Sequence, residues 1–298
     1  MYDVIILGSG PAGLTAAIYC GRAKKNTLVL AGESLGGQTG EIAKLENYPG
    51  WNGSGMELIN FMKTQAESFG AKLEFASATD IKFNSDNTYS VVCDNGKTLD
   101  SKTVILATGA RARRLEIDGA RELFGHGVSY CATCDGFFYS GRDVLVIGGG
   151  NAALNDALYL ADVAKSVKIV YRKSAFTRAE AVIRDRIGEK ANIECIFNTE
   201  LKSIAQKPDS DRLIATTTTG DTIECDGIFV AIGHEANTDY LSENIKRDEM
   251  GRLDSKGLPL GMFVAGDVKS DIQMQIATAV GTGCSAGMDA IKYLNSKE

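Results

Sequence analysis

Tyr2-Asp-Val-Ile-Ile-Leu-Gly-Ser-Gly-Pro-Ala-Gly13 is a short apolar run that ends in a Gly-x-Gly-x-x-Gly turn, and residues 14–23 continue it as a helical pattern. Such a run predicts a buried parallel strand. In the strand–turn–helix unit, Gly8 makes the tight turn, Gly10 lets a pyrophosphate approach the backbone, and Gly13 allows the helix to pack on the strand. The alternative is a glycine turn with a purely structural role.

Glu33 strengthens the nucleotide-binding interpretation of this turn. It lies about 20 residues after the turn, just beyond an expected strand at residues 27–30. A carboxylate at this point can accept hydrogen bonds from a ribose diol, which suits FAD.

The same device recurs in Asp143-Val-Leu-Val-Ile-Gly-Gly-Gly-Asn-Ala-Ala153, with Gly148, Gly150 and Ala153 in the turn and a helix expected at residues 154–163. Each copy is followed by a strand that ends in Ala-x-Gly, at residues 104–109 and 228–233. The sequence therefore predicts an α/β protein with two Rossmann-like, three-layer nucleotide-binding domains.

The order of these parts predicts that the second domain is inserted into the first. We expect the FAD-binding domain in residues 1–113 and 235–298, and an NAD(P)-binding domain that carries the paired cysteines in residues 114–234. The last segment should open as a strand at residues 262–266 and close as a helix from Gln275 to about Tyr293. Two chain crossings between domains would form a hinge.

The second unit differs from the first where its second strand ends. That strand, residues 167–171, is followed by Arg172, Lys173 and Arg178 instead of an acid. Guanidinium and ammonium groups bind a 2′-phosphate that an acid would repel, so the second site suits NADP. The alternative is a solvated basic face.

Cys131-Ala-Thr-Cys134-Asp-Gly136 is the sharpest chemical feature. Two residues between cysteines permit a small disulfide ring, and such pairs exchange readily. No metal is expected, because a zinc site needs about four ligands and the sequence has no second Cys-x-x-Cys. Asp135 is a candidate general acid or an ordinary turn residue. The remaining cysteines stand alone and are expected to be buried small hydrophobes: Cys20, Cys93, Cys195, Cys225 and Cys284.

Composition excludes several other classes of protein. The chain has 298 residues, enough for about two domains. Its two histidines, His126 and His234, exclude a histidine-rich metal site, and its net charge of −6 argues against nucleic acid or an anionic membrane as a partner. No stretch approaches the roughly 18 apolar residues of a membrane span, and the start lacks the pattern of a signal peptide. We expect a soluble, cytoplasmic protein.

A flavin, a nicotinamide and a dithiol together imply one reaction. Hydride passes from the nicotinamide to the flavin, which reduces the disulfide, and the dithiol then reduces a partner by exchange.

Several motifs spread along the whole chain carry a family resemblance. They are Gly8-Ser-Gly-Pro-Ala-Gly13, Gly36-Gly-Gln38, Glu46-Asn-Tyr-Pro-Gly50, Ala107-Thr-Gly109, Cys131-Ala-Thr-Cys-Asp-Gly-Phe-Phe138, Gly233-His234 with Asn237-Thr238, and Ala265-Gly-Asp267. With them the chain resembles the low-molecular-weight, bacterial-type thioredoxin reductases, homodimeric FAD-dependent pyridine nucleotide-disulfide oxidoreductases. The resemblance implies a thioredoxin-disulfide reductase driven by NADPH. Its nucleotide domain would carry both the dithiol and the NADPH site and would rotate to present them to the flavin in turn.

The resemblance also implies roles for individual residues. Cys134 would face the flavin, Cys131 would attack the partner disulfide, and Asp135 would be the general acid. Phe137 and Phe138 would dock thioredoxin, unless they are ordinary core aromatics. FAD contacts are implied for Gly32, Gly37, Gln38, Asn47, Thr108, Gly109, Gly266, Asp267, Gln275 and Ile276, beside the turn residues and Glu33. NADP contacts fall on Gly148, Gly150, Asn151, Ala153, Arg172, Lys173 and Arg178.

Departures from the family pattern cluster along the nicotinamide site. Where the family usually has an acidic pair, this chain has Asn155-Asp156. The family's His-Arg-Arg is replaced by Tyr171-Arg172-Lys173, and the arginine that usually precedes the C-terminal glutamine is replaced by Met274. NADH or ferredoxin therefore stays open as the electron donor. A flavin dithiol oxidase and a non-catalytic nucleotide sensor are the competing functions.

Overall fold

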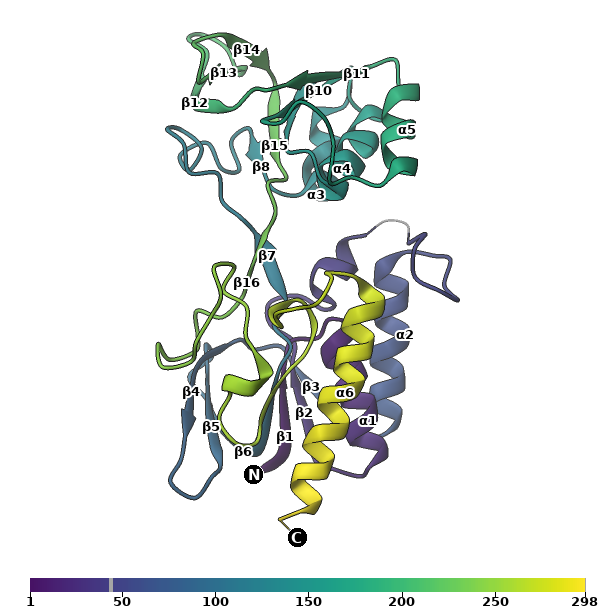
Figure 1. Cartoon of the computed structure of the whole chain (residues 1–298), viewed down its shortest axis with the longest axis vertical. Helices are drawn as coiled ribbons and strands as arrows, with labels where there is room; N and C mark the ends of the chain where they lie inside the picture. The colour runs from purple at the N-terminus through teal and green to yellow at the C-terminus, as the bar shows by residue number, and fades with distance from the viewer. Residues whose placement is uncertain (43–44, 298) are drawn as a thin grey trace. The chain divides into compact units, whose positions relative to one another are not determined.

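The computed structural model describes residues 1–42 and 45–297, and the chain forms two compact units. The outer unit comprises Met1–Arg111 and Glu235–Glu298, and the inserted unit comprises Ala112–His234. The chain leaves the outer unit along β7 (Ala110–Ala112) and returns along β16 (His234–Ala236); these two strands pair with each other (Figure 1).

The outer unit is built on one mixed sheet in the order β3-β2-β1-β6-β5-β4, with β17 also paired to β6. The pairs β3-β2, β2-β1, β1-β6 and β6-β17 are parallel, whereas β4 and β5 form an antiparallel hairpin that continues onto β6. The strands are β1 (Tyr2–Leu7), β2 (Thr27–Leu30), β3 (Lys72–Glu74), β4 (Ala78–Phe83), β5 (Tyr89–Cys93), β6 (Thr98–Leu106) and β17 (Met262–Val264).

Both faces of this sheet are covered, which explains the unbroken apolar run of β1. Val4 and Ile6 pack in one cluster with α1 (Pro11–Arg22) and α6 (Ile276–Asn295), which lie side by side in Figure 1. Ile5 and Leu7 belong to a second cluster, with residues of β5 and of the segment after β16. The other helical elements of this unit are α2 (Gly55–Ser68), η1 (Gly37–Glu41), η3 (Ser255–Gly257) and η4 (Gly266–Val268).

The inserted unit repeats this plan on a smaller scale. A parallel sheet in the order β11-β10-β9-β15-β8 is accompanied by an antiparallel sheet, β12-β13-β14. The strands are β8 (Val128–Ser129), β9 (Asp143–Ile147), β10 (Ser166–Tyr171), β11 (Ile193–Phe197), β12 (Leu201–Gln206), β13 (Leu213–Thr217), β14 (Thr222–Cys225) and β15 (Gly227–Val230). The helical elements are α3 (Ala132–Asp135), η2 (Gly136–Tyr139), α4 (Asn151–Ala161) and α5 (Ala181–Glu189).

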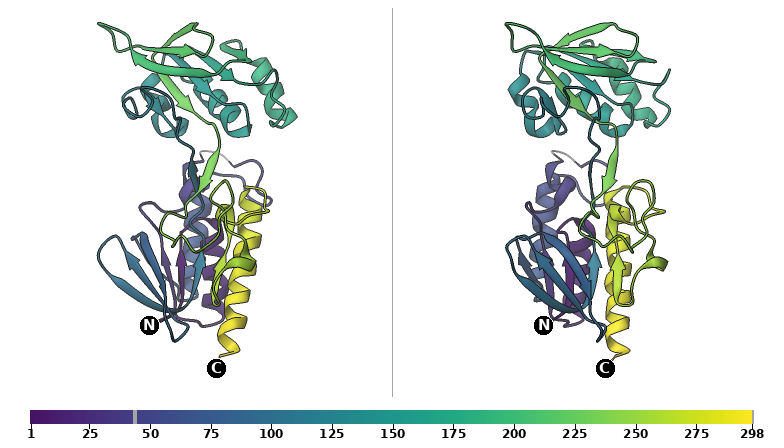
Figure 2. Two further views of the ribbon diagram at one scale, coloured as in Figure 1. Left: turned by 60° about the vertical axis from the view of Figure 1, so that its left-hand side comes forward. Right: turned by 90° about the vertical axis from the view of Figure 1, so that its left-hand side faces the viewer.

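Alternate residues of β9 face two different layers. Val144 and Val146 pack with α4 and α5, whereas Leu145 and Ile147 pack with residues of β12 and β13. Figure 2 shows the same layering, with teal helices on one side of the parallel sheet and the green antiparallel sheet on the other. The two-domain, three-layer α/β fold predicted from the sequence is confirmed.

The glycine turns of the two units have the same geometry. Gly8 has φ +109°, and a Cβ on it would lie 2.2 Å from the carbonyl oxygen of Ala107 at the end of β6. Gly148 has φ +142°, and its Cβ would lie 2.2 Å from the carbonyl oxygen of Ala231 after β15. The two Ala-x-Gly segments therefore pack directly on the two turns, which is why glycine is needed there.

The helices begin earlier than their apolar pattern predicts. The sequence predicted starts at residues 14 and 154, but α1 begins at Pro11 and α4 at Asn151. Gly10 and Gly150 are the N-cap residues, so each turn leads into its helix without a linker. In the described ranges no helix is long and apolar enough to cross a membrane.

Candidate functional sites

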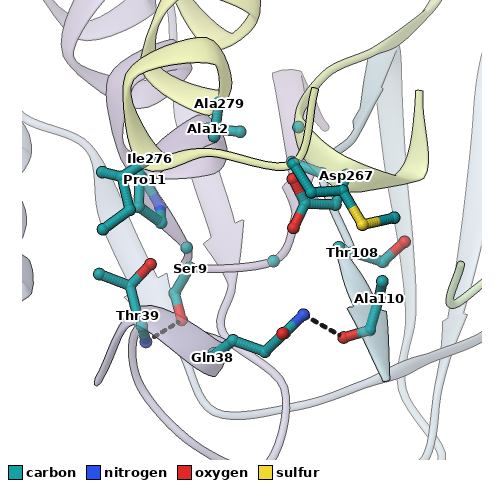
Figure 3. Close-up of a pocket in the computed structure, with 18 of the residues that line it drawn as sticks. Ser9, Pro11, Ala12, Gln38, Thr39, Thr108, Ala110, Asp267, Ile276 and Ala279 are labelled. Atoms are coloured by element: carbon teal, nitrogen blue, oxygen red, sulfur yellow. Dashed lines mark hydrogen bonds between the residues drawn. The ribbon is translucent and has the colours of Figure 1, made fainter. Parts of the chain in front are cut away.

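The first candidate site is a cavity in the outer unit, where β1 and β6 end and α1 begins. The residues that line it are Gly8, Ser9, Gly10, Pro11, Ala12, Ala31, Gly36, Gly37, Gln38, Thr39, Ile42, Asn47, Ala107, Thr108, Gly109, Ala110, Asn237, Gly266, Asp267, Met274, Gln275, Ile276 and Ala279 (Figure 3). This is the position at which open α/β sheets bind nucleotides, beyond the carboxyl ends of the strands.

Two side chains fix the loop after β2 against the rest of this cavity. The Ser9 hydroxyl donates to the Ala31 carbonyl at 3.2 Å and accepts from the Gly36 N–H at 3.0 Å. On the opposite side the Gln38 amide donates to the Ala110 carbonyl at 2.7 Å (Figure 3). The loop is therefore anchored at both ends by its neighbours, and the cavity has a defined wall.

Asp267 supplies the test of whether a cofactor fits this cavity. Asp267 lines the cavity, and its buried Oδ1 atom has no hydrogen-bond partner within residues 1–42 and 45–297. Burial also raises the pKa of this carboxyl group. A buried carboxylate oxygen without a donor is costly, so a ligand with hydroxyl groups fits this place. The residues present are compatible with the sugar part of a flavin nucleotide.

Most of the residues predicted for FAD line this cavity. Gly13, Gly32 and Glu33 do not, and the reasons differ. Gly13 lies inside α1, where a Cβ would come within 1.9 Å of the Gly8 carbonyl oxygen, as its predicted packing role requires. Gly32 is half-buried and Glu33 is exposed after β2. The FAD contact of Gly32 and the ribose contact of Glu33 stay predictions.

Sequence reasoning missed Ser9 as a residue of the first cavity. Its signal was available, since it stands between two glycines of the turn. Its role depends on a loop more than twenty residues away in the chain, which no local pattern shows.

The second candidate site is a cavity at the corresponding place in the inserted unit. It is lined by Arg113, Leu115, Ile117, Ile147, Gly148, Gly149, Gly150, Asn151, Ala152, Val170, Tyr171, Arg172, Lys173, Arg178, Thr199, Glu200, Leu201, Ala231, Ile232 and Gly233. All residues predicted for NADP are among them except Ala153, which is fully buried under the turn. Arg172, Lys173 and Arg178 are exposed and also line this cavity. Their assignment to NADP stays a prediction.

Two acidic residues bond to predicted members of this second site. Asn151 donates from its amide to the Glu180 carboxylate at 2.7 Å and accepts from the Glu180 N–H at 2.8 Å. Glu200 lines the cavity itself, with its Oε1 atom 3.9 Å from Nη1 of Arg172. The basic end of the cavity is therefore partly neutralised by a carboxylate.

The third candidate site is the cysteine turn of the inserted unit. Cys131 and Cys134 form a disulfide across α3, with their Cα atoms 5.3 Å apart. The Cys134 N–H donates a hydrogen bond to the Cys131 sulfur at 3.2 Å. Cys134 is exposed and Cys131 is half-buried. A backbone donor aimed at a sulfur stabilises that sulfur as a thiolate once the disulfide is reduced.

Ser129 connects this turn to Asp135. The Ser129 hydroxyl donates to the Asp135 carboxylate at 2.6 Å and accepts from the Cys131 N–H at 3.1 Å. Asp135 is thus held next to the disulfide by a defined side-chain contact. No sequence motif predicts this role for Ser129, although it stands only two residues before Cys131.

Phe137 and Phe138 follow the turn and point into solvent, with 75% and 72% of their surface exposed. The alternative that they are core aromatics is therefore wrong. Two exposed phenylalanines in sequence are unusual on a surface that has no partner.

The other cysteines divide into two groups. Cys20, Cys93 and Cys225 are buried as expected, and burial raises the pKa of Cys20 and of Cys225 to about 12. Cys195 and Cys284 are only partly buried, so the expectation was wrong for these two. Cys195 lies on β11 at the margin of the core, and Cys284 lies on α6 next to Met288.

Comparison with known proteins places the chain in a family. Residues 2–283 match the pyridine nucleotide-disulphide oxidoreductase family. A thioredoxin reductase of Mycolicibacterium smegmatis is 37% identical over 100% of this chain and 98% of that protein. A bifunctional thioredoxin reductase/thioredoxin of Mycobacterium leprae is 40% identical over 99% of this chain but 66% of its own length.

Solved structures agree with the sequence relatives. The thioredoxin reductase of Lactococcus lactis superposes with a TM-score of 0.92 at 36% identity, covering 99% of this chain and 100% of that one. The thioredoxin reductase of T. acidophilum gives a TM-score of 0.88 at 32% identity, covering 100% and 99%. The chain belongs to the pyridine nucleotide-disulphide oxidoreductase family.

Proposed function

We propose that this protein is an FAD-dependent thioredoxin reductase, in which two electrons pass from NADPH through FAD to the Cys131–Cys134 disulfide and then to oxidised thioredoxin. The observation that carries the proposal is the disulfide itself, held in a short turn in which Cys134 is exposed. It occurs in a chain that also has two nucleotide-type cavities and matches thioredoxin reductases over its full length.

FAD would occupy the first cavity, where the Gly8–Gly10 turn and Asp267 provide contacts for its phosphates and hydroxyl groups. When bound, FAD accepts a hydride from the nicotinamide and supplies two electrons to a disulfide. The two crossings β7 and β16 would be the hinge that lets the inserted unit present its nucleotide site and its disulfide to the flavin in turn. This hinge is part of the proposal.

The thiol chemistry then belongs to this chain's own residues. The Cys131 thiolate attacks one sulfur of the partner disulfide, so that a mixed disulfide forms and the other partner sulfur leaves as a thiolate. The Cys134 thiolate next attacks the Cys131 sulfur. The Cys131–Cys134 bond forms again, the second partner sulfur leaves, and the two partner sulfurs take up two protons. Asp135 is placed beside the turn to supply one of them.

The finer assignments rest on particular residues. NADPH as the donor is supported by Arg172, Lys173 and Arg178 around the second cavity. Docking of thioredoxin is supported by the exposure of Phe137 and Phe138. A homodimer is expected from the resemblance to the family.

Two measurements test this function. Purified protein should carry a yellow flavin, and anaerobic mixing with NADPH should bleach the flavin absorbance band. Parallel mixing with NADH and with reduced ferredoxin identifies the donor. Rapid return of the flavin absorbance band when the reduced protein meets oxygen, without thioredoxin turnover, would identify a dithiol oxidase. Correctly folded protein that binds no flavin would refute the proposal.

A pair of cysteine variants completes the test. Cys134→Ser should abolish thioredoxin reduction while the flavin stays bound. Cys195→Ser, which alters a half-buried cysteine outside the turn, should keep the activity. A Cys134→Ser enzyme that still reduces thioredoxin would exclude disulfide exchange at this turn.

A further inference from the structure

Glu200 faces the same cavity as the basic residues that would hold a 2′-phosphate. Among the described residues that line this cavity it is the only acid, whereas Arg113, Arg172, Lys173 and Arg178 supply positive charge. Its Oε1 atom lies 3.9 Å from Nη1 of Arg172. The carboxylate and a phosphate would therefore compete for the same guanidinium group.

The backbone holds Glu200 in this place. β11 runs parallel to β10 with Phe197 opposite Tyr171, and the chain stays paired beyond the strands. The Asn198 N–H donates to the Lys173 carbonyl and the Thr199 N–H donates to the Tyr171 carbonyl, each at 3.1 Å. On the other side of the segment, the Glu200 carbonyl accepts from the Thr218 N–H at 2.9 Å. These bonds hold the backbone of Glu200 beside the segment that carries Arg172.

The two nucleotides respond differently to such a residue. A 2′-phosphate carries between one and two negative charges at neutral pH, so a nearby carboxylate repels it and occupies its cation. A ribose diol is neutral, and a carboxylate can accept a hydrogen bond from it, as in sites for NAD.

We propose that Glu200 is a specificity-determining residue, which lowers the preference of the second cavity for 2′-phosphorylated nucleotides and allows NADH to be used beside NADPH. The inference rests on the proposed function, because it assigns the second cavity to the electron donor. Both side chains of the Arg172–Glu200 pair are more than half exposed, at 64% and 56%. Solvent screening therefore makes the effect moderate.

The test uses two small probes that need no turnover. Adenosine 2′,5′-bisphosphate carries the phosphate in question and adenosine 5′-monophosphate lacks it, and calorimetry on the FAD-loaded protein gives their affinities. Glu200→Gln should bind the bisphosphate about fivefold more tightly, with the affinity for the monophosphate unchanged. The ratio of kcat/KM for NADPH over NADH should rise by the same factor.

A matched control is available on the neighbouring strand. Glu194 on β11 pairs with Lys168 on β10, with 3.7 Å between Oε2 and Nζ, and neither residue lines the cavity. Glu194→Gln therefore removes a similar ion pair without changing the site. It should leave both affinities unchanged. Arg172→Gln should lose the preference for the bisphosphate over the monophosphate, because the 2′-phosphate would bind to the Arg172 guanidinium group.

Three outcomes would overturn the inference. They are an unchanged affinity ratio in Glu200→Gln, an equal change in Glu194→Gln, and wild-type protein that binds neither probe. None depends on thioredoxin. Failure of the proposed function would appear separately, as protein that cannot pass electrons to thioredoxin after chemical reduction by dithionite.

Discussion

The Ser129 hydroxyl lies 2.6 Å from the Asp135 carboxylate and, at the same time, 3.1 Å from the Cys131 N–H, so one buried side chain joins the candidate general acid to the backbone of the cysteine turn. Ser129 ends β8, at the edge of the parallel sheet of the inserted unit. The rigid part of the fold thus fixes the geometry of a short turn that carries the disulfide.

Ser129→Ala should slow thioredoxin reduction by about tenfold while the flavin is still reduced at the normal rate by its donor. The reason is that Asp135 loses its anchor and can no longer be held where a proton is needed, a smaller loss than removal of an acid–base group. Stopped-flow measurement of the two half-reactions separates the effects.

Ser166→Ala is the matched control for that variant. Ser166 donates to the Asp143 carboxylate at 2.7 Å in the same unit, but far along the chain from the cysteine turn. It should lose a similar hydrogen bond, worth about 1 kcal/mol of stability, without slowing either half-reaction. If both serine variants slow the enzyme equally, Ser129 has only a structural role.

Gly148→Ala should weaken nucleotide binding to the second cavity and lower the free energy of unfolding by about 2 kcal/mol or more. The added methyl group would meet the Ala231 carbonyl oxygen at 2.2 Å and the Ala153 Cβ at 2.9 Å, on a backbone with φ +142°. Urea unfolding gives the stability, and calorimetry with adenosine 5′-monophosphate gives the affinity.

Gly188→Ala provides the comparison for the glycine variant. Gly188 lies in α5, where an added Cβ meets nothing within 4 Å. Here alanine should stabilise the helix by about 0.5 to 1 kcal/mol. A Gly148→Ala protein as stable as wild type would show that the turn tolerates a side chain after all.

Phe137→Ala together with Phe138→Ala should raise KM for thioredoxin by at least about tenfold and leave kcat for a small disulfide substrate unchanged. Exposed aromatic side chains supply much of the binding free energy at protein interfaces, whereas a small substrate does not need them. Phe75→Ala, which removes another ring that is 62% exposed, should change neither value. An unchanged KM in the double variant would exclude these rings from docking.

The sequence predicted what depends on local geometry. The two glycine turns, the Ala-x-Gly segments and the cysteine turn each follow from a few adjacent residues. Long-range contacts could not be predicted in the same way. Glu200 meets Arg172 only because β11 pairs with β10 in one register, and Ser9 meets Gly36 only because a loop folds back on the turn.

Glu33 shows the limit of a rule based on spacing. An acid just after the second strand of such a unit usually reaches the ribose. Here the side chain is exposed beyond β2 and is not among the residues that line the first cavity, so its contact with the ribose stays a prediction. Spacing fixes the place of a residue along the chain but not the direction of its side chain.

Asp156 on α4 should make stability depend on pH, because burial raises the pKa of its carboxyl group to about 7. Below about pH 4 the group is protonated in both folded and unfolded chains, so it adds no penalty. Between about pH 4 and pH 7 the unfolded chain releases a proton that the folded chain keeps, and the free energy of unfolding falls as the pH rises. Asp156→Asn should therefore stabilise the protein by about 1 to 3 kcal/mol at pH 8 and hardly at all at pH 4.

Asp185→Asn, at an exposed position on α5, should give no such difference. Urea unfolding at a series of pH values measures both. Parallel curves for wild type and Asp156→Asn across this range would contradict a half-buried carboxyl group that keeps its proton.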